Sequence, residues 1–383
     1  MRRSDTPYKI PFNRPCFQGK ELAYIAEAIH GGQISGNGAF TQRCQAQLSR
    51  ELGGAKIILT TSCTDALEMA AILLDLAAGD EVIMPTFTFV STANAFALRG
   101  ARPVFVDIRP DTLNLDAAKV RRAVTPRTKA IVAVHYAGVG CEMDALSAIA
   151  EEHDLFVVED NAHGLFGGYA GRPLGTFGEL STLSFHETKN FTCGEGGALV
   201  VNDPSFAERA EIIRDKGTNR ARFFRGEVDK YSWVDLGSSF LPSDVLAAFL
   251  LAQLEARERI QAQRREIWDY YASHLRDWAR ERGVTLPTVP DRCEQAYHMF
   301  YLLMPSLAAR TRLTEHLKSA GILAVFHYAP LHLSTMGLAR GGRAGDCPVA
   351  EGVADRLLRL PFYNDFTEDD QQAVVDAIRS CRF

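Results

Sequence analysis

The chain has 383 residues, of which 46% are hydrophobic, and its formal net charge is −5 at pH 7. This length is sufficient for two domains with substantial apolar cores. The negative charge provides no general attraction for nucleic acid, and no dense Lys/Arg run or basic-aromatic repeat predicts a nucleic-acid groove. No run of 18 apolar residues occurs, and residues 1–12 lack the apolar region of a signal peptide. We therefore expect neither membrane insertion nor export.

Strand-like and helix-like segments alternate through about the first two thirds of the chain. Apolar runs predict strands at 55–60, 81–85, 102–108, 129–135, 155–160, 181–185 and 198–202. Their near-continuous Val and Ile content suits strands that are buried on both faces. Residues 65–76 and 143–153 have apolar side chains at helical spacing. The pattern predicts an α/β fold with a mostly parallel central sheet flanked by helices.

The last third of the chain predicts a second, smaller unit. From Ser243 to about Arg280 the sequence indicates one long helix or two abutting helices that bridge two domains. After a proline-containing break, it predicts a strand at 298–304, a helix at 311–320, a strand at 322–328 and two terminal helices. We expect a large cofactor-binding domain over residues 1–245 and a small carboxy-terminal α/β domain over residues 246–383, which includes the bridging helix.

The eight cysteines show neither CxxC pairs nor histidine-flanked metal spacing. Two of them, Cys63 and Cys193, fall within segments that carry candidate site residues. We therefore expect free thiols in a reducing, cytoplasmic compartment and no metal site.

Two residues predict a pyridoxal phosphate site. Lys189 lies in SFHETKN, after an apolar strand and ahead of the turn TCGEGG, and Asp160 ends the strand-like segment LFVVED. Pyridoxal phosphate bonds to a lysine amine that has lost its proton, which burial favours, and it needs a carboxylate opposite its ring nitrogen. A lysine and an aspartate at the ends of two strands supply both groups. Taken singly, each is more often a solvated charge, a turn residue or a helix cap.

A candidate phosphate site follows the first predicted strand, where the segment TTSCTDALEMAAILL turns into a helix. The free N–H groups and the dipole of the first helical turn favour a dianion, and Ser62 and Thr64 add hydroxyl groups. The alternative is an ordinary capped helix, which we would prefer if this segment stood alone.

The candidate residues all follow predicted strands, and ligands of open parallel sheets bind at the carboxyl ends of the strands. No GxGxxG follows a first strand and no Walker A pattern occurs, which disfavours a dinucleotide or P-loop site. A Gly-x-Ser-x-Gly elbow is also absent. Residues 216–230 mix basic side chains with acids and glycine. They suit either a mobile loop that meets a small anion such as a diphosphate or a solvated surface loop.

Ordered motifs along nearly the whole chain resemble one family. They are PFNRPCFQGKELAYIAEAI, PTFTFVSTANAFALRGARPVFVDI, VHYAG, VVEDNAHGLFGGY, SFHETKN with GEGG, KGTNR with DKYSW, SDVLAAFLLAQLE and FHYAPLH. These segments are similar to the DegT-type sugar-nucleotide aminotransferases of the aspartate aminotransferase fold, which is fold type I of the pyridoxal-phosphate enzymes. They are most similar to members that aminate dTDP-4-keto-6-deoxy-D-glucose to dTDP-4-amino-4,6-dideoxy-D-galactose.

The resemblance assigns roles to the candidate residues. It implies that Lys189 is the Schiff-base lysine, that Asp160 pairs with the pyridine nitrogen, and that the ring of Phe89 stacks on the cofactor. From the residues alone, Phe89 is equally well a core phenylalanine.

The phosphate contacts are assigned in the same way. The resemblance implies that Cys63 and Thr64 hold the phosphate, with a further hydroxyl from Ser184. Ser239 stands where many members present an asparagine to the phosphate of the neighbouring subunit, and its shorter hydroxyl needs a water to reach that far.

Two histidines lie close to these positions. His163 stands where many relatives carry a glutamine that contacts the ring hydroxyl of the cofactor, and an imidazole can donate the same hydrogen bond. His186 lies three residues before Lys189. It either orients the sugar or the lysine, or it is a packed, hydrogen-bonded histidine. In related keto-sugar dehydratases a histidine replaces the lysine itself. Here the lysine is present, which favours transamination over dehydration.

The resemblance also implies where the sugar nucleotide binds. His327 and Tyr328, with His332 behind them, would face the sugar, and residues 216–231, including Lys230 and Tyr231, would approach the nucleotide. Packing is the alternative role for these residues. The family further implies a homodimer with shared active sites and no nucleic-acid or membrane partner.

The expected reaction has two halves. L-Glutamate transfers its amine to the cofactor, which becomes pyridoxamine phosphate, and the keto-sugar then accepts that amine at C4 with Lys189 moving the protons. The principal alternative is a 3-keto-6-deoxyhexose transaminase, followed by a pyridoxal- or pyridoxamine-phosphate-dependent sugar dehydratase. A non-catalytic sensor that binds the cofactor would leave Lys189 and Asp160 together without a reason. We expect a product used for an O-antigen in lipopolysaccharide, another surface glycolipid or an antibiotic.

Overall fold

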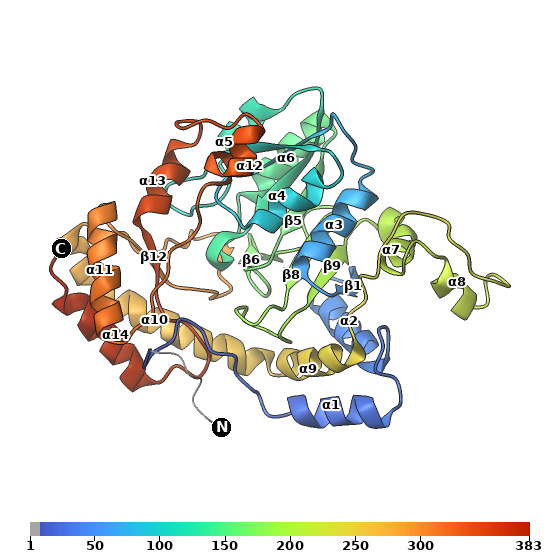
Figure 1. The fold of residues 1–383 in the computed structure, drawn as a ribbon, viewed down its shortest axis with the longest axis horizontal. Coiled ribbons are helices and arrows are strands. Elements are labelled where there is room, and N and C mark those ends of the chain that lie inside the picture. The colour runs from blue at the N-terminus through green and yellow to red at the C-terminus, as the bar shows by residue number, and fades with distance from the viewer. Residues whose placement is uncertain (1–7) are drawn as a thin grey trace.

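The computed structural model describes residues 8–383 (Figure 1). Its centre is a seven-stranded sheet in the order β1-β9-β8-β5-β4-β2-β3. The strands are β1 (Lys56–Thr60), β2 (Glu81–Pro85), β3 (Arg102–Val106), β4 (Thr128–Val134), β5 (Phe156–Asp160), β8 (Leu180–Ser184) and β9 (Gly197–Val201). All seven predicted strands are therefore confirmed, and the fold is the predicted α/β type with a mostly parallel sheet.

β9 is the one antiparallel strand of this sheet, since it pairs antiparallel with both β1 and β8. The connection from β8 to β9 contains no helix. A parallel neighbour is usually reached through a crossover helix, and this connection, without one, returns the chain in the opposite direction. This connection carries Lys189.

Helices cover both faces of the sheet, and successive residues of a strand point to opposite faces. On one face Val158 packs with α3 (Cys63–Leu73), α4 (Val90–Ala97) and α7 (Ala207–Arg214). On the other face Val157 packs with α5 (Ala117–Ala123) and α6 (Met143–His153). The same face continues over β1, β8 and β9, where α2 (Ala39–Glu51) and α9 (Asp244–Glu255) lie. These strands are therefore buried on both faces, as their composition predicts.

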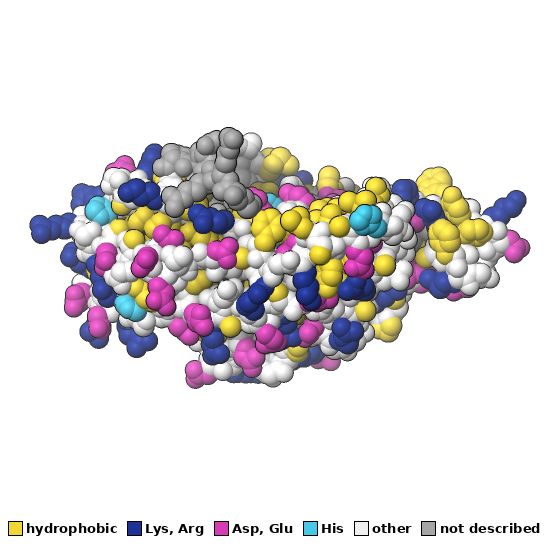
Figure 2. Space-filling model, turned by 90° about the horizontal axis from the view of Figure 1, so that it is seen from below, with side chains coloured by type: hydrophobic (Ala, Val, Ile, Leu, Met, Phe, Trp, Pro, Cys, Tyr) yellow, Lys and Arg dark blue, Asp and Glu magenta, His cyan; other side chains and the backbone are white. Residues whose placement is uncertain are grey.

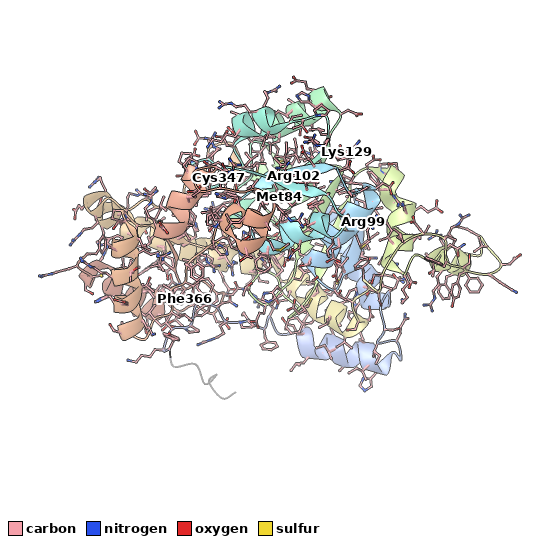
Figure 3. The ribbon with its side chains drawn as sticks, turned by 45° about the horizontal axis from the view of Figure 1, so that its top comes forward. Met84, Arg99, Arg102, Lys129, Cys347 and Phe366 are labelled. Atoms are coloured by element: carbon pink, nitrogen blue, oxygen red, sulfur yellow. The ribbon has the colours of Figure 1, made fainter. Side chains whose placement is uncertain are left out.

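The carboxy-terminal part has its own apolar core. It contains α10 (Arg257–Arg282), β10 (Cys293–Glu294), β11 (Tyr301–Leu303), α11 (Leu307–Ser319), α12 (Thr335–Ala339), α13 (Pro348–Arg356), β12 (Leu357–Arg359) and α14 (Glu368–Ser380). Figure 3 labels Phe366 in this core and Met84 in the core of the central sheet, and the two lie well apart.

The remaining short elements surround these two cores. They are α1 (Glu21–His30), α8 (Arg220–Phe224), β6 (Gly168–Tyr169), β7 (Arg172–Pro173) and three 3-10 turns at 136–138, 204–206 and 331–333. β10 of the carboxy-terminal part pairs with β6, so the two parts are also joined at a small sheet.

The strand predicted at 322–328 is wrong. This segment forms only isolated bridges, from Ile322 to Ile10 and from Val325 to Arg359. Its apolar alternation is that of a strand, but it passes between two different partners and so builds no continuous ladder.

The long helical segment is two abutting helices that meet at Ala256. The first, α9, packs in the core of the large part, whereas Ile267 of α10 already belongs to the carboxy-terminal core. Ile10 also belongs to that core. The domain division into 1–245 and 246–383 stays a prediction.

Within residues 8–383, no helix is long and apolar enough to cross a membrane, and no three His, Cys, Asp or Glu side chains cluster as a metal site would require. The amino-terminal stretch that we considered as a signal peptide lies partly, at residues 1–7, outside the described residues.

Candidate active site

A cavity of about 790 Å³ opens at the carboxyl ends of the central strands. Its wall combines the strand ends of the large part with segments around His298, His327 and Arg359 from the carboxy-terminal part. Ten of the predicted site residues line it: Cys63, Thr64, Phe89, Asp160, His163, Ser184, His186, Lys189, His327 and Tyr328. The cavity therefore brings together most of the site that the sequence predicts.

Lys189 lies on the turn between β8 and β9, where its backbone N–H donates to the His186 carbonyl at 2.9 Å. Burial lowers the pKa of its amine to about 8, although the nearby Cys63 and Asp160 oppose this shift. Removal from water disfavours the ammonium form. A substantial fraction of Lys189 is therefore the neutral, nucleophilic amine near neutral pH.

Asp160 is the last residue of β5 and is buried. Its Oδ2 accepts a hydrogen bond of 2.7 Å from the Thr92 hydroxyl, and its Oδ1 accepts one of 3.3 Å from the Ala162 N–H. The carboxylate is thus fixed in orientation by neutral donors and faces the cavity without a cationic partner in direct contact.

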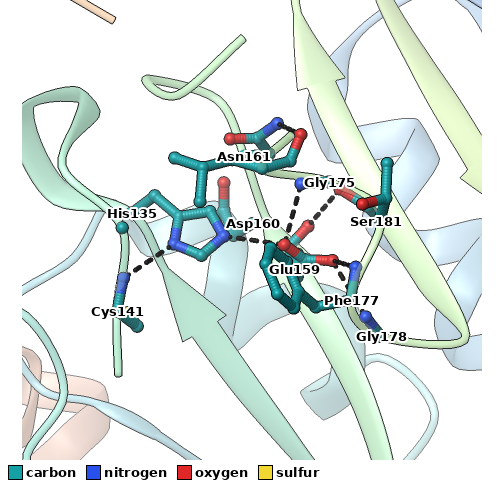
Figure 4. Close-up of polar contacts among 12 residues, drawn as sticks. His135, Cys141, Glu159, Asp160, Asn161, Gly175, Phe177, Gly178 and Ser181 are labelled. Carbon is teal, nitrogen blue, oxygen red and sulfur yellow. Dashed lines mark hydrogen bonds and ion pairs between the residues drawn. The ribbon is translucent and has the colours of Figure 1, made fainter. Parts of the chain in front are cut away.

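The neighbouring residue Glu159 points to the other side of β5 and anchors this strand end (Figure 4). Its side chain is fully buried and accepts backbone N–H groups of Gly175, Phe177 and Gly178 at 2.8, 2.6 and 2.9 Å. The fourth donor is His135, whose Nε2 lies 2.9 Å from the carboxylate. The backbone N–H of Cys141 donates to Nδ1 of the same ring, so the ring proton is on Nε2. A saturated buried carboxylate of this kind holds the loop 175–178 and β5, and hence Asp160, in place.

The predicted phosphate site at the start of α3 lies in the cavity wall. Ser62 caps the helix by accepting the Asp65 N–H at 3.1 Å, so this hydroxyl acts as a cap and not only as a ligand donor. The Thr64 hydroxyl lies 2.7 Å from that of Ser91, and Cys63 Sγ lies 3.5 Å from the Thr182 hydroxyl. Ser62, Cys63 and Thr64 line the cavity, and the start of a helix generally provides N–H groups and a dipole that favour a phosphate.

His163 has one ring nitrogen available to a ligand. Its ring stacks on His298 with centroids 4.2 Å apart, and its buried Nδ1 has no hydrogen-bond partner within residues 8–383. Burial lowers the pKa of both histidines well below the ordinary value, so both rings are neutral. His298 is itself fixed, because its Nδ1 lies 2.9 Å from Oδ1 of Asn190.

These features fit pyridoxal phosphate. The cavity contains the Lys189 amine with its lowered pKa, a carboxylate on Asp160 and a helix start for a dianion, each of which matches one polar group of that cofactor. The unpaired Nδ1 of His163 matches a fourth, the ring hydroxyl. A buried polar atom without a partner usually indicates a missing ligand or water.

Aromatic side chains line the mouth of the cavity. Phe89 begins α4 with 57% of its surface exposed, and its ring lies 6.4 Å from that of Tyr328. His327 is buried beside Tyr328, and its Nδ1 lies 3.0 Å from the Tyr136 hydroxyl. His186 is partly exposed and its Nδ1 lies 2.9 Å from the Thr188 hydroxyl.

Four predicted residues do not line the cavity of the described chain. His332 is buried behind it, where its two ring nitrogens contact Thr86 at 2.7 Å and Glu351 at 3.0 Å, so it packs and does not face a sugar. Ser239 is exposed and bridges to Asp215. Lys230 and Tyr231 belong to a projecting arm that carries α8.

The basic side chains of that arm are engaged with acids. Arg222 pairs with Glu208 and Glu227, and Arg225 pairs with Glu211 and Glu227. A contact between residues 216–231 and a nucleotide stays a prediction.

Thr92, His298 and Arg359 are among the residues of the cavity wall that were not predicted from the sequence. Thr92 lies in the hydroxyl-rich motif PTFTFVSTAN, which offered a signal for it. His298 and Arg359 lie in apolar segments of the carboxy-terminal part, where no spacing links them to Lys189.

Comparisons with known proteins identify the family of the chain. Residues 15–379 match the DegT/DnrJ/EryC1/StrS aminotransferase family. The chain is 33% identical to the spore coat polysaccharide biosynthesis protein SpsC of Bacillus subtilis over 97% of this chain and 96% of that protein.

Two solved structures are similar over almost their whole length. The aminotransferase TlmJ from Streptoalloteichus hindustanus is 31% identical with a TM-score of 0.87, covering 98% of both chains. The putative sugar aminotransferase Spr1654 from Streptococcus pneumoniae, in its pyridoxal phosphate form, is 26% identical with a TM-score of 0.90, covering 97% of this chain and 98% of that one.

Proposed function

The chain belongs to the DegT/DnrJ/EryC1/StrS aminotransferase family and is a pyridoxal-phosphate-dependent sugar aminotransferase, and we propose that its acceptor is dTDP-4-keto-6-deoxy-D-glucose. The proposed product is dTDP-4-amino-4,6-dideoxy-D-galactose, with L-glutamate as the amino donor. One observation carries this proposal: the buried amine of Lys189 and the carboxylate of Asp160 share a cavity with a helix start suited to a dianion.

Each side chain has a defined task in this proposal. Bound pyridoxal phosphate supplies an electron sink that acidifies the carbon next to the transferred amine. Asp160, oriented by Thr92, keeps the ring nitrogen protonated. Lys189 removes the proton from the α-carbon of glutamate in the first half-reaction and delivers a proton to C4 of the sugar in the second. The lowered pKa of Lys189 suits both directions of proton transfer near neutral pH.

His163 and Phe89 hold the cofactor ring in this proposal. The neutral imidazole of His163 has its unpaired Nδ1 available for the ring hydroxyl, and Phe89 at the start of α4 stacks on the ring face. Cys63, Thr64 and Ser184 surround the phosphate. Orienting the ring in this way aligns the reacting carbon with the Lys189 amine.

The runner-up is transamination of a 3-keto-6-deoxyhexose, because the same lysine can reach either carbon if the hexose is turned in the cavity. A dehydratase is less well supported, because a free Lys189 amine is present to receive and return the proton.

We also propose that the active enzyme is a cytoplasmic homodimer. Large apolar side chains at and near the cavity mouth are exposed, among them Phe89 at 57% and Phe326 at 64%, and Trp233 on the arm is 78% exposed. Figure 2 shows hydrophobic side chains along one edge of the molecule and on the arm at the right. Contiguous exposed apolar surface indicates a protein interface. In a dimer, Ser239, Lys230 and Tyr231 would complete the partner's site. The product would serve a surface polysaccharide such as an O-antigen, or an antibiotic.

The test is a two-step absorbance measurement. The yellow cofactor-loaded enzyme is treated with L-glutamate, freed of amino acid, and then given dTDP-4-keto-6-deoxyglucose or its 3-keto isomer. We expect glutamate to bleach the yellow colour and the 4-keto sugar to restore it. Restoration by the 3-keto sugar alone would replace the proposed acceptor, and failure to bleach would reject transamination.

Lys189→Ala supplies the matched variant for this test. We expect no multiple turnover, because among residues 8–383 no other lysine lines the cavity to move the proton. Lys129→Ala, which removes an exposed lysine on β4, should retain full activity (Figure 3). Measurable multiple turnover by Lys189→Ala would sink the assignment of this lysine.

A further inference from the structure

Arg359 ends β12 and lines the same cavity as Lys189. Its backbone is fixed on two sides, because it pairs with Tyr301 of β11 and exchanges hydrogen bonds of 2.7 and 3.1 Å with Val325. The side chain crosses the ring of Phe12, with the guanidinium carbon 4.6 Å from the ring centroid. The position of this cation is therefore set by rigid strand structure and not by a mobile loop.

The guanidinium of Arg359 has few hydrogen-bond partners within residues 8–383. Within residues 8–383 its side chain makes one hydrogen bond, a long one of 3.3 Å from Nη2 to the Phe326 carbonyl, and its buried Nε has no partner there. No carboxylate of residues 8–383 forms an ion pair with it, and the groups that favour its charge are the hydroxyls of Tyr136 and Tyr328. Burial lowers its pKa, which reflects the cost of removing the charge from water.

A second buried arginine shows what a purely structural role looks like. Arg264 donates to the carbonyls of Tyr297 and His298 at 2.9 and 2.6 Å and to Oδ1 of Asn364 at 3.0 Å. All three of its nitrogens are engaged, and it does not line the cavity. Arg359 has five donors in a planar fork and uses one of them weakly, so it has the capacity for a bidentate anion.

The positive charge of Arg359 changes the pKa of other groups in the cavity wall. It lowers the pKa of the Lys189 amine and of the rings of His163 and His327. The carboxylate of Asp160, which favours the charged form of Lys189, already accepts a hydrogen bond from Thr92. An anion that enters the cavity is therefore attracted to Arg359, close to the amine that must act on it.

We propose that Arg359 recognises a carboxylate of the substrates and so positions the carbon that exchanges its proton with Lys189. The inference rests on the proposed transamination, in which the amino donor carries carboxylates. The amino donor is the first source of this carboxylate, and a sugar acceptor that bears a carboxylate on its hexose is the second. A guanidinium fits this task better than an ammonium, because its fork binds both carboxylate oxygens and fixes their plane.

The experiment compares the cofactor-loaded wild-type enzyme with Arg359→Gln and Arg359→Lys. L-Glutamate bleaching is measured without any sugar, so the result does not depend on the identity of the acceptor. We expect Arg359→Gln to raise the half-saturating glutamate concentration by about 10- to 100-fold, the loss typical of a charge-assisted hydrogen-bonded pair. Arg359→Lys should fall between the two, because it keeps the charge and loses the fork.

A non-reactive ligand provides a readout besides activity. Glutarate has the two carboxylates of glutamate and no amine, so it can bind but cannot react. We expect glutarate to raise the melting temperature of the wild-type holoenzyme and not that of Arg359→Gln. Melting without ligand reports whether each variant is folded. Arg356→Gln is the matched control, because Arg356 also lies beside β12 but bonds to the Gly352 carbonyl and does not line the cavity.

The outcomes separate the sources. A loss seen with glutamate and with L-alanine assigns the α-carboxylate, and a loss with glutamate alone assigns the side-chain carboxylate. If the half-saturating concentration of the amino donor is unchanged and the KM rises only for a sugar nucleotide that carries a hexuronic acid, Arg359 binds the carboxylate of the acceptor. A raised KM for a sugar nucleotide without a hexose carboxylate would move the contact to the diphosphate and overturn the proposal. Unchanged values for all substrates would also overturn it.

If bleaching by glutamate depends on Arg359 and no dTDP-keto-sugar restores the colour, the proposed acceptor fails and the role of Arg359 stands.

Discussion

Replacing Gly197 with alanine should separate β9 from the start of α3. A Cβ at this position would lie 2.3 Å from the carbonyl carbon of Ser62, 2.4 Å from the nitrogen of Cys63 and 2.5 Å from the Ser62 oxygen. These are backbone atoms at the start of α3, where we propose that the phosphate binds, so no side-chain rotation relieves the contact. Gly197 pairs with Thr60 on one side and Ser184 on the other, which holds β9 in the sheet.

The size of the effect follows from this geometry. Carbon atoms prefer separations of about 3.5 Å or more, so β9 and the helix start must move apart by about 1 Å. Overpacking of this kind costs about 1–3 kcal/mol, and weakening one of the ladder hydrogen bonds adds about 1 kcal/mol. We expect Gly197→Ala to lower the free energy of unfolding by about 3 kcal/mol and to weaken binding of the phosphate-bearing cofactor in the protein that remains folded.

Urea denaturation of the apoprotein measures the first effect, and titration with pyridoxal phosphate measures the second. Gly168→Ala is the matched control, because Gly168 also lies in a strand and a Cβ there would meet its nearest atom at an ordinary 3.4 Å. If Gly197→Ala and Gly168→Ala differ by less than about 0.5 kcal/mol, within the range of neutral substitutions, the close approach of β9 to α3 is not a stability constraint.

Two further perturbations test the site. Because burial lowers the pKa of Lys189 to about 8, about a quarter of its amine should be neutral at pH 7.5. The rate at which the apoenzyme turns yellow with pyridoxal phosphate should therefore rise with pH and level off above about 8, and a rate still rising steeply beyond pH 10 would contradict the buried amine. Glu159→Gln should lower the free energy of unfolding by about 3 kcal/mol, since an amide N–H₂ would face backbone N–H donors that now meet a carboxylate. In a urea titration, Glu258→Gln, whose side chain is 92% exposed, should change little, and an equal effect of the two would refute the anchoring role of Glu159.

Local sequence patterns determined much of this protein. The seven central strands, the helices between them and the strand-end positions of Asp160 and Lys189 follow from apolar runs and from residues beside them in the chain. The residues of β9 do not predict whether it runs parallel or antiparallel to its neighbours, because an apolar strand has the same composition in either direction. Its antiparallel direction accompanies a β8–β9 connection that has no crossover helix. Residues 322–328 have the pattern of a strand but form none. The reason is that no single partner segment runs alongside them.

The chemical detail of the site was decided by tertiary contacts. Hydroxyls, histidines and an arginine far apart in sequence meet at the cavity: Thr92 holds Asp160, His298 stacks on His163, and Arg359 faces the same space as Lys189. Likewise, the sequence does not distinguish His327 from His332. In the structure His327 lines the cavity, whereas His332 is buried behind its wall in contact with Thr86. Local periodicity reports which face of an element is buried. It cannot report which distant element covers that face, and the pKa and the free hydrogen-bonding groups of a side chain depend on that covering.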